Sequence, residues 1–209
     1  EESARIETDG DMSLIIVDIP IVDAESTSFM YTTLPLAVML CDSAIVTVCL
    51  RETAILNDFI TNRVKNFYTY KKNTFLLQIL YKNATKFLQN LKQIDKTSTQ
   101  IQAELTRSYK NKELIQLLNL EKSLVYFSTS LTSNEMVLHK LKRFDFIRKY
   151  EEDNDLLEDV IIENRQAIEM CTIYRDILSG TMDAFASVIS NNLNIAMKLL
   201  AAITIVMAI

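Results

Sequence analysis

Six carboxylates and no basic residue occur in the short segment 151–159, EEDNDLLED. Carboxylate oxygens are the ligands that Mg²⁺ and Ca²⁺ prefer in proteins, so this segment has the chemistry to hold a hard divalent cation. It lacks the glycine that an EF-hand loop needs. Acidic residues also stabilise the N-terminus of a helix through its dipole. The segment alone leaves a metal-binding role and a helix-capping role open.

Few other residues in the chain are suited to chemistry. There is one histidine, His139, and there are three cysteines, Cys41, Cys49 and Cys171, without a CxxC motif. A hydrolase triad or a His-rich metal site therefore has almost nothing to be built from, and we predict that the protein is not an enzyme. We expect His139 to be a surface or helix-packing residue and the cysteines to be reduced thiols that act as small hydrophobes.

The elements that must position these residues begin with strands. The chain has only 2 Gly and 2 Pro, and both prolines lie in its first forty residues. Strands are therefore expected at the start and long helices afterwards. Residues 12–20 predict a buried strand, 34–50 a hairpin around CDSA, and 52–67 a helix. Together they predict a partial α/β layer over residues 1–70.

Two helices with apolar residues at alternating steps of three and four follow. The first pattern comprises Leu77, Leu80, Ala84, Phe87, Leu91, Ile94, Ser98, Ile101 and Leu105, and the second Leu117, Leu120, Leu124, Phe127, Leu131, Asn134, Leu138 and Leu141. Heptad spacing on two segments joined by a short polar turn predicts an antiparallel helical hairpin over residues 71–149. A third helical pattern runs from about Asp155 to the end, on the order of 80 Å. The fold class is therefore α+β.

The predicted hairpin is strongly basic. Residues 71–149 hold 15 basic and 6 acidic residues, against 4 and 11 in residues 1–70 and 3 and 10 in residues 150–209. A basic hairpin is compatible with nucleic-acid binding. However, its lysines are scattered along amphipathic helices without an aromatic platform. We expect a solvated face that attracts acidic neighbours or the anionic inner leaflet, and no nucleic-acid partner.

The last helix becomes steadily more apolar. After Lys198, its last charge, eleven residues cover about 16 Å, which is about half of a hydrocarbon core. This end is either a buried helix of a soluble domain or the first part of a transmembrane helix. A second stripe, small and polar, has the same 3.5-residue period and faces either bulk water or the water-filled axis of a helical ring. It consists of Asp176, Gly180, Asp183, Ser187, Ser190, Asn194, Met197 and Ala201.

The segment YRDILSGTMDAFASVISNNLNIAMKLLAAITIV resembles the stalk helix and early first membrane segment of CorA-type transporters of magnesium and related divalent cations. The resemblance continues through the acidic segment, the helical hairpin and PLAVMLCDSAIVTVCLRE. It implies a homopentamer in the cell inner membrane, with this portion on the cytoplasmic side. The family's Gly-Met-Asn signature does not occur in these residues, so we expect a fragment, cut within the first membrane helix, that does not transport by itself.

The resemblance divides the chain into a regulatory domain (1–70), a helical hairpin (71–149), a stalk helix (150–198) and the start of the first membrane helix (199–209). It implies that Mg²⁺ is both transported and regulatory, with Co²⁺, Ni²⁺ or Zn²⁺ as alternative ions. The alternatives that remain are a zinc or other divalent cation exporter of the same fold and a helical scaffold without transport.

The resemblance also assigns roles to individual positions. Asn194, Met197 and Leu200 match residues that line the constriction on the cytoplasmic side, and Asp183 and Ala201 lie on the same pore stripe. Ala201 and the next alanine stand where relatives commonly carry Thr or Ser. Asp159 matches a carboxylate that binds regulatory magnesium between subunits, and Asp23 aligns with its partner in the next subunit.

Overall fold

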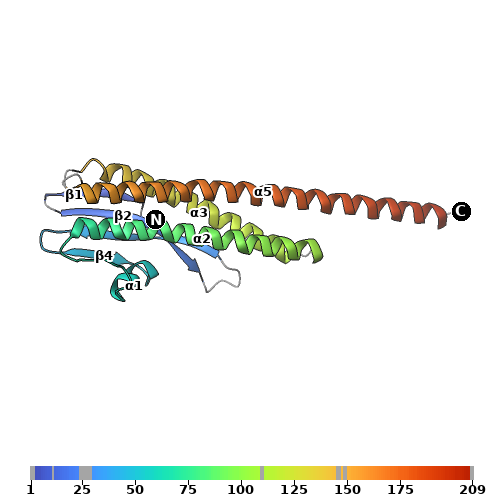
Figure 1. Cartoon of the computed structure of the whole chain (residues 1–209). Coiled ribbons are helices and arrows are strands. Elements are labelled where there is room, and N and C mark those ends of the chain that lie inside the picture. Colours follow the sequence, from blue (N-terminus) through green and yellow to red (C-terminus); the bar gives the residue numbers. More distant parts are fainter. Residues whose placement is uncertain are drawn as a thin grey trace.

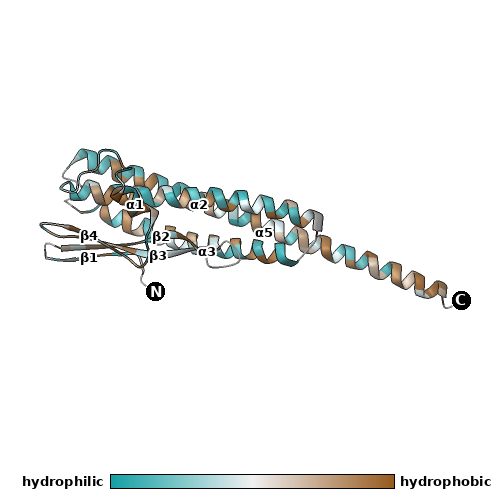
Figure 2. Cartoon of the chain, turned by 90° about the horizontal axis from the view of Figure 1, so that it is seen from below, coloured by the Kyte–Doolittle hydropathy of each residue, from teal (hydrophilic) through white to brown (hydrophobic). Residues whose placement is uncertain are grey.

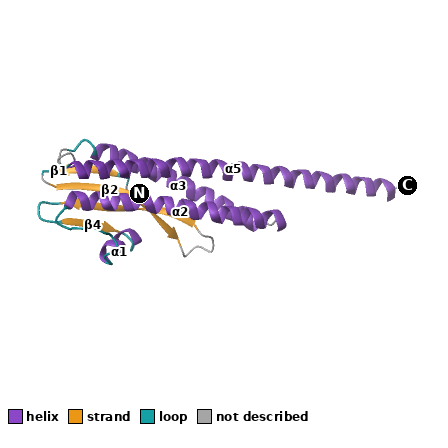
Figure 3. Ribbon diagram, viewed as in Figure 1, coloured by secondary structure: helices purple, strands orange, loops and turns teal. Residues whose placement is uncertain are grey.

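A small sheet lies at one end of the molecule and three long helices run away from it (Figure 1). The computed structural model describes residues 3–10, 12–23, 30–108, 111–144, 147 and 150–207. The last helix, α5, continues far beyond the other two, as the secondary-structure colouring shows (Figure 3). The predicted α+β class is confirmed.

The sheet is an antiparallel meander of four strands in the order β1-β2-β3-β4. They are β1 (Arg5–Asp9), β2 (Met12–Asp23), β3 (Met30–Leu40) and β4 (Ile45–Cys49). The strand predicted over 12–20 is present but extends to Asp23. The hairpin predicted around CDSA is confirmed, with the Cys41 N–H donating to the Ala44 carbonyl at 2.9 Å. Strand β1 and the first residues of β3 were not predicted.

Both prolines lie inside the two long central strands, where a missing N–H would normally break a ladder. Pro20 pairs with Thr33 across β2 and β3, but β1 pairs with β2 only as far as Ile16. Likewise, β4 pairs with β3 only from Leu36 onward, so Pro35 has no β4 neighbour. Each proline therefore turns its nitrogen toward an open edge, and the sheet loses no hydrogen bond.

The predicted helix over 52–67 is wrong in length. Helix α1 covers only Ala54–Ile60, with the Thr53 hydroxyl accepting from the Ile55 N–H at 3.2 Å as its N-cap. Asn62 and Asn66 then adopt φ of 57° and 55°, which a continuing right-handed helix does not allow. The apolar periodicity beyond Ile60 belongs to a loop that returns Phe67 to the core.

The helical hairpin is as predicted. Helix α2 covers Lys72–Ser108 and α3 covers Asn111–Leu141. All seventeen residues of the two heptad patterns are buried. At the centre, the rings of Phe87 and Phe127 meet edge to face at 5.0 Å. The packing of these stripes, not helix propensity, holds helices of this length together.

Helix α5 covers Glu151–Met207 and packs against both α2 and α3 over its first half. It begins four residues earlier than the periodicity predicts, because acidic residues occupy its first turn. The Asn164 amide donates to the Leu131 carbonyl at 3.1 Å, and the Cys171 thiol to the Leu124 carbonyl at 3.1 Å. These contacts fix how far α5 is shifted along α3.

The cysteines are free thiols, as predicted. Burial raises the pKa of Cys171 to about 11, so it stays protonated at neutral pH. His139 is exposed near the end of α3, in agreement with a surface role.

Two asparagines attach the sheet to the helices through the backbone N–H and C=O of one residue of β2, Asp18. The Asp18 N–H donates to Asn134 Oδ1 at 2.9 Å, and the Asp18 carbonyl accepts from Asn134 Nδ2 and Asn83 Nδ2, each at 2.8 Å. Asp18 lies where β1 no longer pairs with β2, so its backbone groups would otherwise lack partners in the sheet. Asn134 thus replaces a neighbouring strand.

We predict that Asn134→Ala lowers the free energy of unfolding by about 2–4 kcal/mol, because it removes two hydrogen bonds and leaves the Asp18 N–H without its acceptor. Urea unfolding followed by circular dichroism in one detergent measures this. Thr129→Ala is the control, because the Thr129 hydroxyl is exposed and bonds only the Val125 carbonyl of its own helix. Equal midpoints for the two variants would contradict the prediction.

Candidate pore-lining and cation-binding helix

Helix α5 loses its partners within the chain about halfway along. Its core-facing residues are buried as far as Leu178, Phe185 is half-buried, and every described residue from 186 onward is exposed. The exposed end is also the most apolar part of the helix (Figure 2). It includes a stretch long and apolar enough to cross a membrane, none of it buried. The alternative of a C-terminal helix buried within this chain is therefore wrong.

The five residues assigned to the pore lie on one broad face of α5. At about 100° per residue, Asp183, Asn194, Met197 and Ala201 fall within about 60° of one another, and Leu200 lies about 60° beyond Met197. All are exposed, with Met197 at 53% and Leu200 at 67%. The structure brings them together on one helix, and their role in a pore stays a prediction.

The acidic segment 151–159 separates into residues with different roles. Asp153 is buried, and the Thr74 hydroxyl donates to its Oδ1 at 2.7 Å, which ties the start of α5 to the start of α2. Glu158 pairs with Lys142 at 2.8 Å. Glu151 and Glu152 are exposed in the first turn, where a carboxylate interacts favourably with the helix dipole. The helix-capping role therefore accounts for part of the segment.

Asp159 remains as a candidate metal ligand. It is exposed and forms no ion pair with a described residue. Within the described part of the chain, no three His, Cys, Asp or Glu side chains gather in a way that could hold a metal ion. Asp23 is the last residue of β2, with its backbone paired to Met30, but its side chain lies outside the described residues. The role of Asp159 as a metal ligand therefore stays a prediction.

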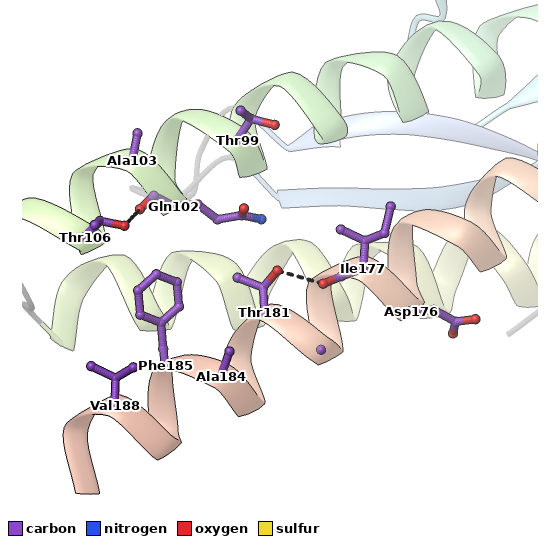
Figure 4. A pocket seen from close by; sticks show the side chains of 11 residues that line it. Thr99, Gln102, Ala103, Thr106, Asp176, Ile177, Thr181, Ala184, Phe185 and Val188 are labelled. Atoms are coloured by element: carbon purple, nitrogen blue, oxygen red, sulfur yellow. Dashed lines mark hydrogen bonds between the residues drawn. The ribbon is translucent and has the colours of Figure 1, made fainter. Parts of the chain in front are cut away.

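A groove of about 650 Å³ separates the far end of α2 from α5. Figure 4 shows Phe185 pointing from α5 toward α2, while Asp176 points away from the groove. The Thr181 hydroxyl is engaged by its own helix, donating to the Ile177 carbonyl at 2.8 Å. Asp176 is the one titratable side chain in the lining, so the groove lacks the paired groups of an active site.

Sequence reasoning missed two features of this region. Asp153 was grouped with its acidic neighbours, although its buried contact with Thr74 makes it a packing residue. Gly180 was assigned to the polar stripe, yet a Cβ at this position would meet nothing within 4 Å. A glycine inside a helix costs about 1 kcal/mol relative to alanine, so space within this chain does not explain it.

Comparison with known proteins identifies what the chain is similar to. The family model described as "CorA-like Mg2+ transporter protein" matches residues 1–209. The cobalt/magnesium transport protein CorA of Methanocaldococcus jannaschii is 26% identical over 213 residues, covering 100% of this chain and 66% of that protein. The complete structure of the CorA magnesium transporter from the same organism superposes with a TM-score of 0.83, covering 97% of this chain and 64% of that one.

A more distant likeness concerns the fold alone. The cytoplasmic domain of ZntB from Vibrio parahaemolyticus superposes with a TM-score of 0.67 at 11% identity, covering 93% of this chain and 75% of that one. The chain thus spans about two thirds of the length of the M. jannaschii relative.

Because the protein has no tryptophan, a single introduced one can report on the end of α5. We predict that the fluorescence of Val206→Trp shifts to shorter wavelength when detergent micelles or lipid vesicles are added, because this exposed apolar end enters the hydrocarbon. Val46→Trp, on strand β4, is the matched control and should not shift. An identical response from both variants would argue against a membrane-inserting end.

Proposed function

The chain belongs to the family of CorA-like Mg²⁺ transporter proteins, and on this premise we propose that it is the magnesium-sensing and gating region of a divalent cation channel, together with the start of its first membrane helix. It lies on the cytoplasmic side of the cell membrane and works as a homopentamer. The observation that carries the proposal is α5, which continues from a packed core into an exposed apolar segment with a separate polar stripe.

Five parallel copies of α5 around an axis would form the conduction path. Met197 and Leu200 would then form apolar rings, which block ions by dewetting when they are narrow. One turn before them, Asn194 offers a carbonyl oxygen to a hydrated cation, and Asp183 attracts cations along the axis. Magnesium suits this lining, because it dehydrates reluctantly and is held by oxygen ligands and retained water.

The sensor in this proposal is the carboxylate of Asp159 at the boundary between subunits, where a carboxylate of the next subunit would be its partner. Carboxylates brought together in a closed ring repel one another unless a cation lies between them. Magnesium therefore stabilises the closed arrangement, and its removal loosens the packing of the subunits. The family and the exposed apolar end of α5 argue against a scaffold without transport.

We predict that the chain, purified in detergent with Mg²⁺, associates as a pentamer of about 120 kDa, five times the 24.0 kDa of one chain. An exposed helix end of this length needs partners on its flanks. Light scattering coupled to size exclusion, corrected for detergent, gives the protein mass. A monomer at high protein concentration, with and without Mg²⁺, would contradict the assembly on which the proposed function depends.

We predict that Asp159→Asn weakens the protection from proteolysis that Mg²⁺ gives, because one ligand charge is lost while the side-chain shape is kept. In the full-length transporter the same change should make channel closure less sensitive to internal magnesium. Limited digestion across a magnesium titration measures the effect on this chain, with Co²⁺ and Zn²⁺ as comparison ions.

Glu152→Gln is the control, because Glu152 is an exposed carboxylate in the first turn of the same helix and lies outside the proposed site. It should retain most of the increment in protection that magnesium produces. An unchanged magnesium response in Asp159→Asn would remove this residue from the mechanism, although the assignment to the family would stand.

A further inference from the structure

Two helix faces expose large apolar side chains that the described residues of this chain leave partly open to water. On α3 they are Ile115, Leu118, Val125 and Met136, which we call the α3 outer face. On α5 they are Ile162, Ile173 and Ile177, the α5 outer face. Met136 is 58% exposed and Ile162 is 62% exposed. Exposed apolar side chains that recur along one side of a long helix favour an interaction surface there.

The two outer faces match in height along the molecule. The contacts of Asn164 with Leu131 and of Cys171 with Leu124 set the antiparallel register of α3 against α5. In this register Leu118 lies level with Ile177, and Met136 and Val125 lie within one helical turn, about 4.5 Å, of the levels of Ile162 and Ile173. Rotation about an axis parallel to α5 preserves height, so neighbouring copies in a ring would bring these pairs together.

The charges that border the apolar residues are complementary at the same heights. Lys140 near the end of α3 and Arg143 in the turn just after it follow Met136, and Asp155 precedes Ile162 on α5, level with Lys140. All three side chains are exposed, and none forms an ion pair with a described residue. The α3 outer face is thus bordered by positive charge and the α5 outer face by negative charge, and no described residue of the same chain neutralises either one.

The two outer faces also point in directions that suit a ring. At about 100° per residue around α5, the side that contacts α3 comes first, then the face of Asp183 and Asn194, then the outer face, and last the side that contacts α2. The candidate pore face thus lies between α3 and the α5 outer face. A ring around that pore would place one neighbour against α3 and the other against the α5 outer face, which is a heterologous contact.

We propose that the α3 outer face of each copy packs on the α5 outer face of the next copy around the ring. This contact rests on the proposed pentamer and names the surfaces that build it. Met136, Val125 and Leu118 of one copy meet Ile162, Ile173 and Ile177 of the neighbouring copy, and Lys140 with Arg143 meets its Asp155.

The same register explains the glycine inside α5. Ile115 of one copy lies level with the segment from Gly180 to Ala184 of the next. Small residues spaced by four allow two helices to approach closely, and Gly180 has open space where a Cβ would be. The helix therefore accepts the cost of a glycine where a bulky side chain of the neighbour arrives.

Disulfide cross-linking tests the contact directly. Met136→Cys combined with Ile162→Cys, in a background with Cys41 and Cys49 replaced by alanine, should give an oxidation ladder from dimer to pentamer in detergent. Each copy carries both halves of a heterologous contact, so the ladder continues beyond the dimer. Met136→Cys combined with Val46→Cys is the control and should give no ladder. Dimers from Met136→Cys alone would overturn the proposal in favour of an isologous contact.

A pair of valine variants tests the apolar part. Val125 is 47% exposed and Val46 is 43% exposed, so an aspartate at either position would reach water in a single chain. We expect Val125→Asp to raise the protein concentration needed for assembly at least tenfold and Val46→Asp to leave it unchanged. Equal effects would overturn the contact while leaving the proposed function intact.

A charge exchange tests the polar part. Lys140→Glu and Asp155→Lys should each raise the concentration needed for assembly roughly three- to tenfold, since each creates like charges across the contact. The double variant should recover most of the loss. A pentameric wild type with unaffected single variants would overturn this contact alone, whereas a monomeric wild type would overturn the proposed assembly as well.

Discussion

The position of the long helices against the sheet depends on the backbone N–H and C=O of Asp18, which Asn134 of α3 and Asn83 of α2 engage. A buried amide left without a partner costs more than a made hydrogen bond contributes, so these contacts specify one register of sheet against hairpin. Helix α5 then takes its place from α3 through Asn164 and Cys171. The direction in which α5 leaves the domain is thus set by polar contacts, while its strength of attachment comes from the apolar stripes.

Helix α5 presents three different faces along its length. One face of α5 packs against α2 and α3, a second carries the candidate pore residues, and a third carries Asp155, Ile162 and Ile173. Heptad spacing keeps the core face in place over the first half of the helix. Beyond Phe185 the core face has no partner among the described residues, and in the proposed assembly the membrane and neighbouring copies would cover the rest of the helix.

The sequence predicted the helices better than the strands and the side chains of the site. Heptad residues such as Leu91 and Leu124 are buried as predicted. An apolar 3.5-residue repeat forms one continuous stripe along a helix, and packing against partner helices removes that stripe from water. The helix predicted to Phe67 stopped at Ile60, because two asparagines take left-handed backbone that periodicity cannot reveal. Asn134 was placed on the core stripe, but its partner depends on where β1 stops pairing with β2. The role of Asp153 likewise depends on a tertiary contact with Thr74.

In the proposed assembly, the contact between the α3 and α5 outer faces would not need magnesium, whereas the Asp159 carboxylate would bind it. The two would therefore have separate roles in gating. The apolar pairs centred on Val125 and Ile173 would hold copies together in every state, so the cation has only to bias the ring. A site occupied at a concentration equal to its Kd stabilises the state that binds it by about 0.4 kcal/mol. Five such sites contribute about 2 kcal/mol, which shifts a two-state equilibrium roughly thirtyfold. In the proposed pentamer, weak and exposed carboxylates such as Asp159 would therefore be sufficient to sense an abundant ion, because symmetry would repeat them around the ring.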